Sequence, residues 1–171
     1  MMLDAARALE PLDLRLARDA LLDTFPMAIY FGDSSAVSAT EVARVALSCK
    51  LPSGIEPRSV DLVLDAIAEL LANGYGTAAP RLREALDAVQ PDAVIHAVPQ
   101  QITQACWIAL PLSDDDALRT LAGTCIATSR EQGAFQALPE ALDYLALREL
   151  RIGTLNVADV LFTEVLELQG V

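Results

Sequence analysis

The chain has 171 residues, which is enough for one domain and too few for two large ones. Apolar residues make up 53% of it and charged residues 21%, a balance that excludes a disordered chain. The 24 acidic residues against 12 basic ones give a formal net charge of −12. Because such a surface repels phosphate backbones, we expect no direct binding of nucleic acid.

The sequence carries no signal for a membrane or for secretion. No uninterrupted apolar run approaches the roughly 18–20 residues of a membrane helix. The N-terminal segment holds Asp4 and Glu10 where a signal peptide would have a basic start and an apolar stretch. Cys49, Cys106 and Cys125 form no CxxC pair, which is typical of reduced, buried thiols. We therefore expect a cytoplasmic protein without a membrane partner.

Helical spacing of apolar residues dominates the first half of the chain. Aromatic residues are only 5%, so the core must consist of Leu, Ala, Val and Ile, which suits helix packing. Asp13 is expected to cap the first clear helix or to offset its dipole, and a kink or break is expected at Pro26. Further helices are expected over 39–47 and 59–71, separated by a long connection over 51–57.

The second half of the chain continues this pattern. The run Ser113-Asp114-Asp115-Asp116 is a strong helix start with acids over its first turn, and Gly133 is a helix end. No segment shows a credible strand pattern. The helices expected in this half cover 80–89, 93–110, 113–132, 138–152 and 155–168. The sequence therefore predicts an all-α protein of eight or nine helices.

The turns between the expected helices recur at a regular interval. Gly32, Gly74, Pro111 and Gly153 mark tight turns roughly 40 residues apart, the period of a solenoid of helical hairpins. After each glycine, alanines and larger apolar residues alternate as in the second helix of a tetratricopeptide repeat. Alanine at these positions lets two helices approach closely. A non-repetitive helix bundle is the alternative.

The expected fold is an all-α, right-handed superhelix of about four antiparallel helical hairpins, similar to tetratricopeptide repeats and forming a single domain over 1–171. In such an array the first helix of each pair faces the concave side. The hairpins are expected over 12–50, 58–90, 93–132 and 135–169.

Three segments, over 6–25, 67–86 and 130–153, resemble the helical-repeat region of large ATP-binding transcriptional regulators of the LuxR family. In that family the region lies between an N-terminal P-loop NTPase and a C-terminal helix-turn-helix domain. The resemblance therefore implies a superhelix that senses a signal or transmits it between those parts. Because this chain has no GxxxxGK[ST] loop and no recognisable helix-turn-helix, we expect a fragment of such a regulator or a shortened relative. The apolar last helix favours a fragment.

Residue types that carry catalysis or bind metals are sparse in the sequence. His96 is the only histidine and has no second ligand at metal spacing, so we expect a structural, hydrogen-bonded role for it. The acidic run 114–116 is explained by helix capping, because it lacks the other ligands of a calcium loop. No GxSxG motif is present. We therefore expect no catalytic residue, no metal and no cofactor, in a protein that is not an enzyme.

A candidate groove is centred on the glutamines of the expected central helix. Its residues are Gln100, Gln101, Gln104, Trp107, Tyr144 and Arg148. If the central helix faces the concave side, its amides would meet Tyr144 or Arg148 and bind a peptide or a small molecule. The alternatives are a solvated face for the glutamines and core packing for Trp107.

Three functions compete on this evidence. The leading hypothesis is a non-catalytic module of a LuxR-family regulator that serves protein interaction or signal sensing, with the NTPase and DNA-binding parts of the parent regulator among its partners. The second is a small-molecule sensor. The third is a small helical enzyme using Asp61 and Asp65, although their i, i+4 spacing is more typical of a solvated helix face. A homodimer is also considered, because a truncated array would leave apolar hairpin surfaces open.

Overall fold

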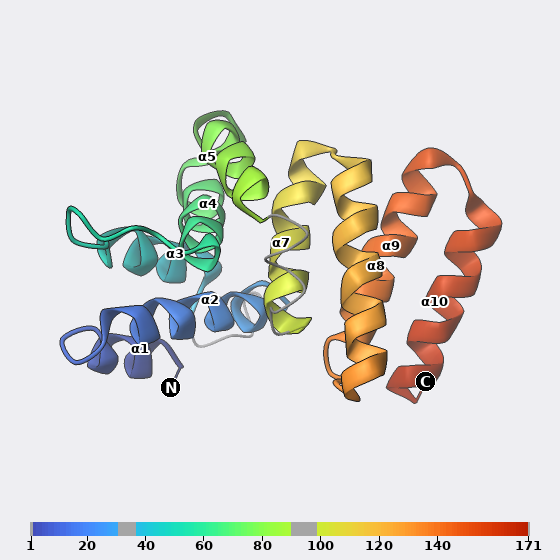
Figure 1. Ribbon diagram of the computed structural model, residues 1–171, viewed down its shortest axis with the longest axis horizontal. Coiled ribbons are helices and arrows are strands. Elements are labelled where there is room, and N and C mark those ends of the chain that lie inside the picture. The colour runs from blue at the N-terminus through green and yellow to red at the C-terminus, as the bar shows by residue number, and fades with distance from the viewer. Residues whose placement is uncertain (1, 31–36, 90–98, 171) are drawn as a thin grey trace. The chain divides into compact units, whose positions relative to one another are not determined.

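The computed structural model describes residues 2–30, 37–89 and 99–170, which form helices and connecting turns without any strand (Figure 1). The expected all-α fold is confirmed, with nine helices in the described ranges. They are α1 Met2–Leu9, α2 Leu14–Tyr30, α3 Ala39–Ser48, α4 Ser59–Asn73, α5 Tyr75–Ala88, α7 Pro99–Leu112, α8 Asp115–Gln132, α9 Leu138–Ile152 and α10 Leu155–Gln169. None of these helices combines the length and the apolar character needed to cross a membrane.

The chain packs as two compact units, Met1–Ala88 and Val89–Val171. In the first unit, α2 packs against α1, α3 and α4, while α4 packs against α3 and α5. The core between these helices contains Leu21, Leu22, Phe25, Val63, Leu64 and Ile67. Helix α1, which the sequence analysis does not predict, adds Leu3 and Ala6 to the buried set. The single superhelical domain stays a prediction.

In the second unit, α7, α8, α9 and α10 stand side by side in chain order (Figure 1). Short connections over 113–114, 133–137 and 153–154 force each helix to run antiparallel to the one before it. Helices α7 and α9 therefore run in the same direction on either side of α8. The pairs α7–α8 and α9–α10 lie within the ranges expected for the third and fourth hairpins.

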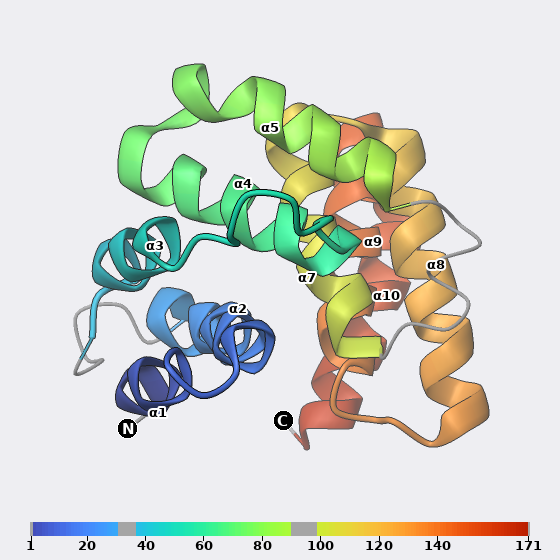
Figure 2. The ribbon, with the colours of Figure 1, turned by 60° about the vertical axis from the view of Figure 1, so that its left-hand side comes forward.

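Alanines occupy the contacts between helices, as the sequence pattern predicts. A side chain of this size lets two backbones approach closely while neighbouring larger side chains fill the grooves beside it. The alanines that are almost completely buried include Ala43, Ala46, Ala78, Ala85, Ala141, Ala146 and Ala158. In the first unit, α4 and α5 form a hairpin with a very short connection, because Gly74 is the one residue between the two helices (Figure 2).

Three of the predicted helix boundaries are confirmed by their hydrogen bonds and backbone angles. The Asp114 carboxylate accepts a hydrogen bond from the backbone N–H of Ala117 and so caps α8. Gly133 and Gly153 end α8 and α9 in the left-handed conformation, which glycine adopts at little cost.

Other predicted boundaries are shifted or absent. The third turn was expected at Pro111, but α7 continues to Leu112 and the turn is made by Ser113, which adopts a positive φ of 56°. Its N–H bonds the carbonyl of Leu110, and the next N–H bonds that of Ala109, so this serine takes the place that glycine usually occupies in a helix C-terminal turn. Of the kink or break expected at Pro26, the break is absent, because α2 continues through this residue to Tyr30.

Two further expectations concern the first unit. The turn predicted at Gly32 lies outside the described residues. The connection predicted over 51–57 does form a turn without helix, but it joins α3 and α4 within one compact unit. Because α3 and α4 pack on each other, that connection is a loop and not a linker between units.

Candidate functional site

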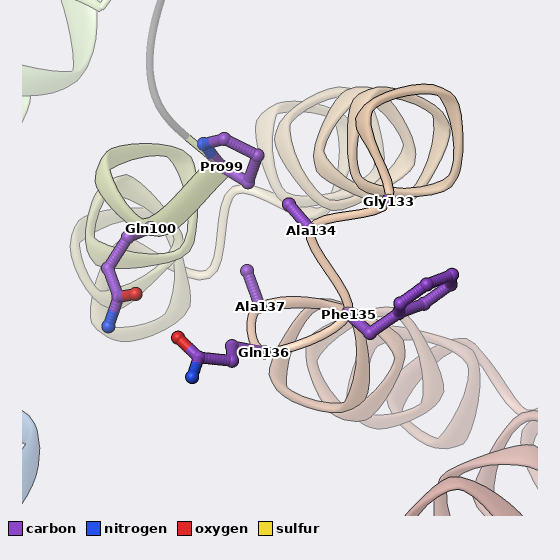
Figure 3. A pocket seen from close by; sticks show the side chains of 7 residues that line it. All are labelled: Pro99, Gln100, Gly133, Ala134, Phe135, Gln136 and Ala137. Atoms are coloured by element: carbon purple, nitrogen blue, oxygen red, sulfur yellow. The ribbon is translucent and has the colours of Figure 1, made fainter.

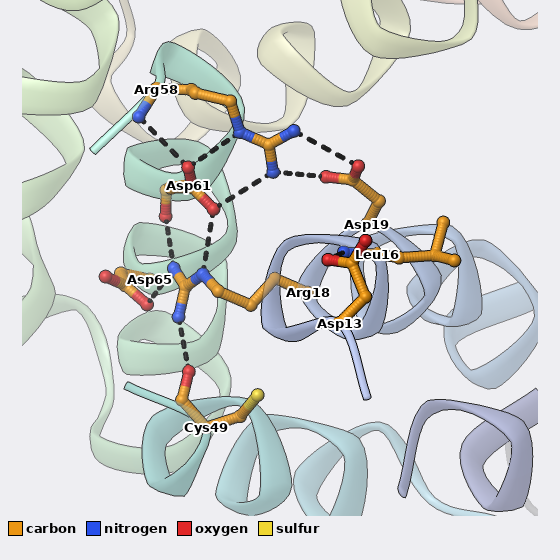
Figure 4. Close-up of polar contacts among 8 residues, drawn as sticks. All are labelled: Asp13, Leu16, Arg18, Asp19, Cys49, Arg58, Asp61 and Asp65. Atoms are coloured by element: carbon orange, nitrogen blue, oxygen red, sulfur yellow. Dashed lines mark hydrogen bonds and ion pairs between the residues drawn. The ribbon is translucent and has the colours of Figure 1, made fainter. Parts of the chain in front are cut away.

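A group of buried charges surrounds Arg18 of α2 in the first unit (Figure 4). The side chain is 1% exposed, and its Nε donates to Oδ1 of Asp61 over 2.8 Å. Its Nη2 donates to Oδ1 of Asp65 and to the carbonyl of Asp61, both over 2.9 Å, while Nη1 donates to the carbonyl of Cys49 over 2.6 Å. One guanidinium therefore holds together α2, the end of α3 and α4.

A second arginine, Arg58, completes the group from the N-terminus of α4. Its backbone N–H and its Nε both donate to Oδ2 of Asp61, over 3.0 and 2.9 Å. Its Nη2 pairs with Oδ1 of Asp19 on α2 over 2.6 Å. We call this set the Arg18 cluster; its members are Arg18, Asp19, Cys49, Arg58, Asp61 and Asp65.

The Arg18 cluster keeps Asp61 ionised. Burial alone would raise the pKa of this carboxyl group, but the hydrogen bonds from Arg58 and Arg18 outweigh burial and lower the pKa to about 2. Bonding to Asp61 also raises the pKa of the Arg58 guanidinium. A carboxylate in this state neither gives nor takes a proton near neutral pH, so it is unsuited to general acid–base catalysis.

The interpretation of Asp61 and Asp65 as a solvated helix face is wrong for Asp61, whose side chain is 1% exposed. Asp65 is partly exposed, yet it is paired with Arg18. The i, i+4 spacing places both carboxylates on one face of α4, and that face meets the guanidinium of Arg18 from α2. The Arg18 cluster is therefore a structural connection between helices, and the pair that motivated the enzyme hypothesis is engaged in it.

The three cysteines are buried free thiols, as the sequence predicts. Burial raises the pKa of Cys49, raises that of Cys125 to about 11 and raises that of Cys106 well above its ordinary value. The Sγ of Cys125 donates to the carbonyl of Pro99 over 3.3 Å. Because the thiolate is the nucleophilic form, these protonated thiols contribute to packing.

In the second unit, a group of polar side chains joins α7 and α9. The indole N–H of Trp107 donates to Oε1 of Glu140 over 3.2 Å. The hydroxyl of Tyr144, one turn further along α9, donates to the same oxygen over 3.3 Å. Glu140 is half-buried, so two donors meet one carboxylate away from most of the solvent. Trp107 and Tyr144 are among the residues predicted from the sequence to line a groove, whereas Glu140 is not.

A hollow opens near the start of both helices. Its volume is about 520 Å³, and its lining is Pro99, Gln100, Gly133, Ala134, Phe135, Gln136 and Ala137. Figure 3 shows the amide groups of Gln100 and Gln136 on the same side of the hollow, with the ring of Phe135 turned away from it. We call the contacts on Glu140, the two amides of the hollow and the buried Gln104 of α7 together the α7–α9 seam; its members are Gln100, Gln104, Trp107, Gln136, Glu140 and Tyr144.

The remaining predicted groove residues differ in their accessibility. Gln104 is 1% exposed, so it belongs to the buried base of the seam. Gln101 is half-buried and lies outside the lining of the hollow. Arg148 donates to the backbone carbonyl of Asp115 over 3.3 Å and pairs with Glu149 beside it. This arginine therefore fixes the position of α9 on α8, and its guanidinium is already engaged.

Glu140 is predicted to stabilise the seam. The variant Glu140→Ala leaves the indole N–H and the phenol hydroxyl without this acceptor, and we expect the free energy of unfolding to fall by about 1–3 kcal/mol. Glu140→Gln keeps an oxygen acceptor and is expected to lose less. Urea unfolding followed by the emission of Trp107, the only tryptophan, measures both. Glu131→Ala, an exposed acid of α8, is the control, and an equal effect of the two alanine variants would contradict the prediction.

Two other candidates from the sequence are placed as follows. His96 lies outside the described residues. The acids 114–116 lie at the start of α8, where Asp114 is the cap and Asp115 pairs with Arg151 over 3.1 Å. Within 2–30, 37–89 and 99–170, no three His, Cys, Asp or Glu side chains are grouped as metal ligands would be.

No family model, no curated protein and no solved structure matches the chain. The resemblance to the helical-repeat region of LuxR-family regulators therefore stays a prediction.

Proposed function

We propose that this chain is a non-catalytic helical-hairpin module that recognises a protein segment along the α7–α9 seam. In the setting that the LuxR-family resemblance implies, such recognition would pass a signal between the NTPase and the DNA-binding parts of a regulator. The observation that carries the proposal is the convergence of Trp107 and Tyr144 on half-buried Glu140, together with the amides of Gln100 and Gln136 at the hollow, two helical turns from Trp107 along α7.

The chemistry of the seam favours recognition of a polypeptide. Amides are donors and acceptors at once, so Gln100 and Gln136 can bond the N–H and C=O groups of a bound backbone. Trp107, two turns further along α7, is half-buried and offers a large, rigid apolar surface, with its polar edge already fixed by Glu140. A rigid aromatic group together with adaptable amides is a combination typical of protein-binding surfaces.

The protonation states of the buried groups support the non-catalytic part of the proposal. Asp61 is held ionised between two arginines, and burial raises the pKa of each cysteine thiol. Groups that perform acid–base or nucleophilic chemistry usually have a pKa shifted toward the working pH. The pKa values of Asp61 and of the three cysteines shift away from it, whereas burial raises the pKa of the Asp143 carboxyl group toward it.

A small-molecule sensor is the second candidate, and the hollow at the start of the seam favours it. Its volume of about 520 Å³ is within the range of small-molecule sites. Its lining, however, contains a single aromatic residue, Phe135, whose ring points away from the hollow. Such a lining would bury little of an apolar ligand, so the polypeptide remains the better fit.

The test starts with a library of linear peptides displayed on phage and selected on the intact chain. Selected peptides are titrated against the protein while the emission of Trp107 is recorded, because this residue reports from the seam alone. We expect Gln100→Ala combined with Gln136→Ala to weaken the binding about tenfold or more, since two hydrogen bonds to the peptide are lost.

Gln132→Ala removes an exposed amide of α8 outside the seam and is the matched control, with binding expected to stay within about twofold. Selected peptides that bind the double variant as well as the wild type would contradict the proposal. The sensor would be favoured by a different result. In that case no peptide binds, and a pool of nucleotides, amino acids and sugars raises the melting temperature of the wild type but not that of the double variant.

A further inference from the structure

Helix α10 leaves much of its apolar surface exposed. Its buried residues are Ala158 and Val165, which lie on one side of the helix. Leu155 is 62% exposed, Val160 66% and Leu166 49%. Leu155 and Leu166 recur at helical spacing with half-buried Phe162 between them and so share one stripe. A contiguous apolar stripe on a surface helix marks a site of contact with another molecule.

Comparison with α8 shows that this apolar character is not required by the hairpin. Helix α8 lies between α7 and α9, whereas the main contact of α10 is α9. When buried Ala122 of α8 is aligned with buried Ala158 of α10, the exposed Arg119 and Arg130 fall at the places of Leu155 and Leu166. Equivalent positions thus carry a charge in α8 and a leucine in α10. The leucines are an added feature of α10.

The charges on α10 all have the same sign. The helix carries Asp159, Glu164 and Glu167 and no basic residue. Glu164 pairs with Arg130 of α8 over 2.5 Å. Asp159 and Glu167 are exposed, and no described ion pair uses them. A second copy of this chain, with its net charge of −12, would bring acidic groups against acidic groups across the stripe.

We propose that α10 is a docking surface for an amphipathic helix of a partner protein, with an apolar stripe flanked by Lys or Arg. The partner's apolar stripe would cover Leu155, Phe162 and Leu166, and one of its basic flanks would lie beside Asp159 and Glu167, which share one side of the stripe. A helix in this position repeats the way in which α9 covers α8. This surface is separate from the α7–α9 seam, so it extends the proposed function without depending on it.

The experiment uses the intact chain and a fluorescein-labelled synthetic helix of about 20 residues, with leucines on one stripe and lysines on both flanks. Two comparison peptides carry the same leucines with glutamates in place of lysines, or the same composition in scrambled order. Binding is measured by fluorescence anisotropy. We expect the lysine helix to bind at least about tenfold more tightly than either comparison peptide.

Two double variants test the stripe. Leu155→Arg with Leu166→Arg gives α10 the residues that α8 has at these places, so the hairpin is expected to fold. Thr120→Arg with Ala127→Arg adds the same charge at two exposed positions of α8, outside the proposed surface, and is the control. We expect the leucine variant to bind the lysine helix at least about tenfold more weakly than this control variant, because only the leucine variant removes the apolar contact.

A third variant tests the charges. Asp159→Lys with Glu167→Lys keeps the stripe and is expected to reverse the preference, so that the glutamate helix binds more tightly. Equal binding of the ordered and scrambled lysine peptides would overturn the proposal, since it would mean attraction to an acidic chain in general. A dimer seen by sedimentation and dissociated by Leu155→Arg with Leu166→Arg would also overturn it, because a second copy would then cover the stripe.

Discussion

Arg18→Ala is expected to lower the free energy of unfolding by about 3–5 kcal/mol, the typical cost of removing one partner of a buried ion pair. The loss has three sources. The Asp61 carboxylate keeps only Arg58 as a counterion, the carbonyl of Cys49 loses its donor, and a cavity is left between α2 and α4. For a domain whose total stability is about 5–15 kcal/mol, this is a large share.

Urea unfolding followed by far-ultraviolet circular dichroism measures the effect. Arg15→Ala, an exposed arginine one turn earlier on α2, is the matched control and is expected to change stability by no more than about 0.5 kcal/mol. Arg18→Lys keeps the charge, but a single ammonium group cannot make all the bonds of the guanidinium, so an intermediate loss is expected. A loss below about 1 kcal/mol in Arg18→Ala would show that the Arg18 cluster does not hold the first unit together.

Asp61 is expected to make the protein sensitive to acid in a defined range of pH. Its pKa is about 2 in the folded protein and near the ordinary value of 3.8 in the unfolded chain. Because the folded pKa is the lower one, the stabilising contribution is fully present above pH 3.8 and is lost as the pH falls toward 2. The difference between these pKa values corresponds to about 2 kcal/mol.

Urea titrations between pH 2 and pH 6 test this expectation, and the comparison variant is Asp61→Asn, which cannot ionise. Between pH 4 and pH 2 the wild type should lose about 2 kcal/mol more than Asp61→Asn, because the other carboxyl groups titrate in both proteins. Asp116→Asn, with its side chain 88% exposed, is the control and should follow the wild type. Parallel curves for the wild type and Asp61→Asn would contradict the assignment of Asp61 as the acid-sensitive group.

The two units use their polar residues in different ways. In the first unit, Arg18 and Arg58 donate hydrogen bonds to the two carboxylate oxygens of Asp61 from opposite sides. Both oxygens are therefore engaged within the Arg18 cluster and do not face a ligand. In the second unit, the amides of Gln100 and Gln136 border a hollow. Recognition is therefore proposed for the second unit, while the charges of the first unit serve stability.

The local pattern of the sequence was sufficient to predict the helices and several of their ends. Apolar spacing predicts helices over 59–71 and 138–152, and the structure has α4 and α9 there. Asp114, Gly133 and Gly153 form their capping hydrogen bonds with residues only a few positions away in the chain. Both partners of each bond are therefore visible in a short stretch of sequence. Ser113 departs from the local pattern, because it adopts the positive φ that glycine usually supplies at the end of a helix.

Tertiary structure alone decided the role of the charged and polar side chains. The spacing of Asp61 and Asp65 shows that they share a face of α4, but not what covers that face; the covering group, Arg18, is distant in the sequence. The same holds for Trp107, whose acceptor Glu140 comes from another hairpin. A helical pattern depends on neighbours in the chain, whereas an ion pair depends on which helices the fold places in contact, so only the packed helices determine which charges are buried and which are available to a partner.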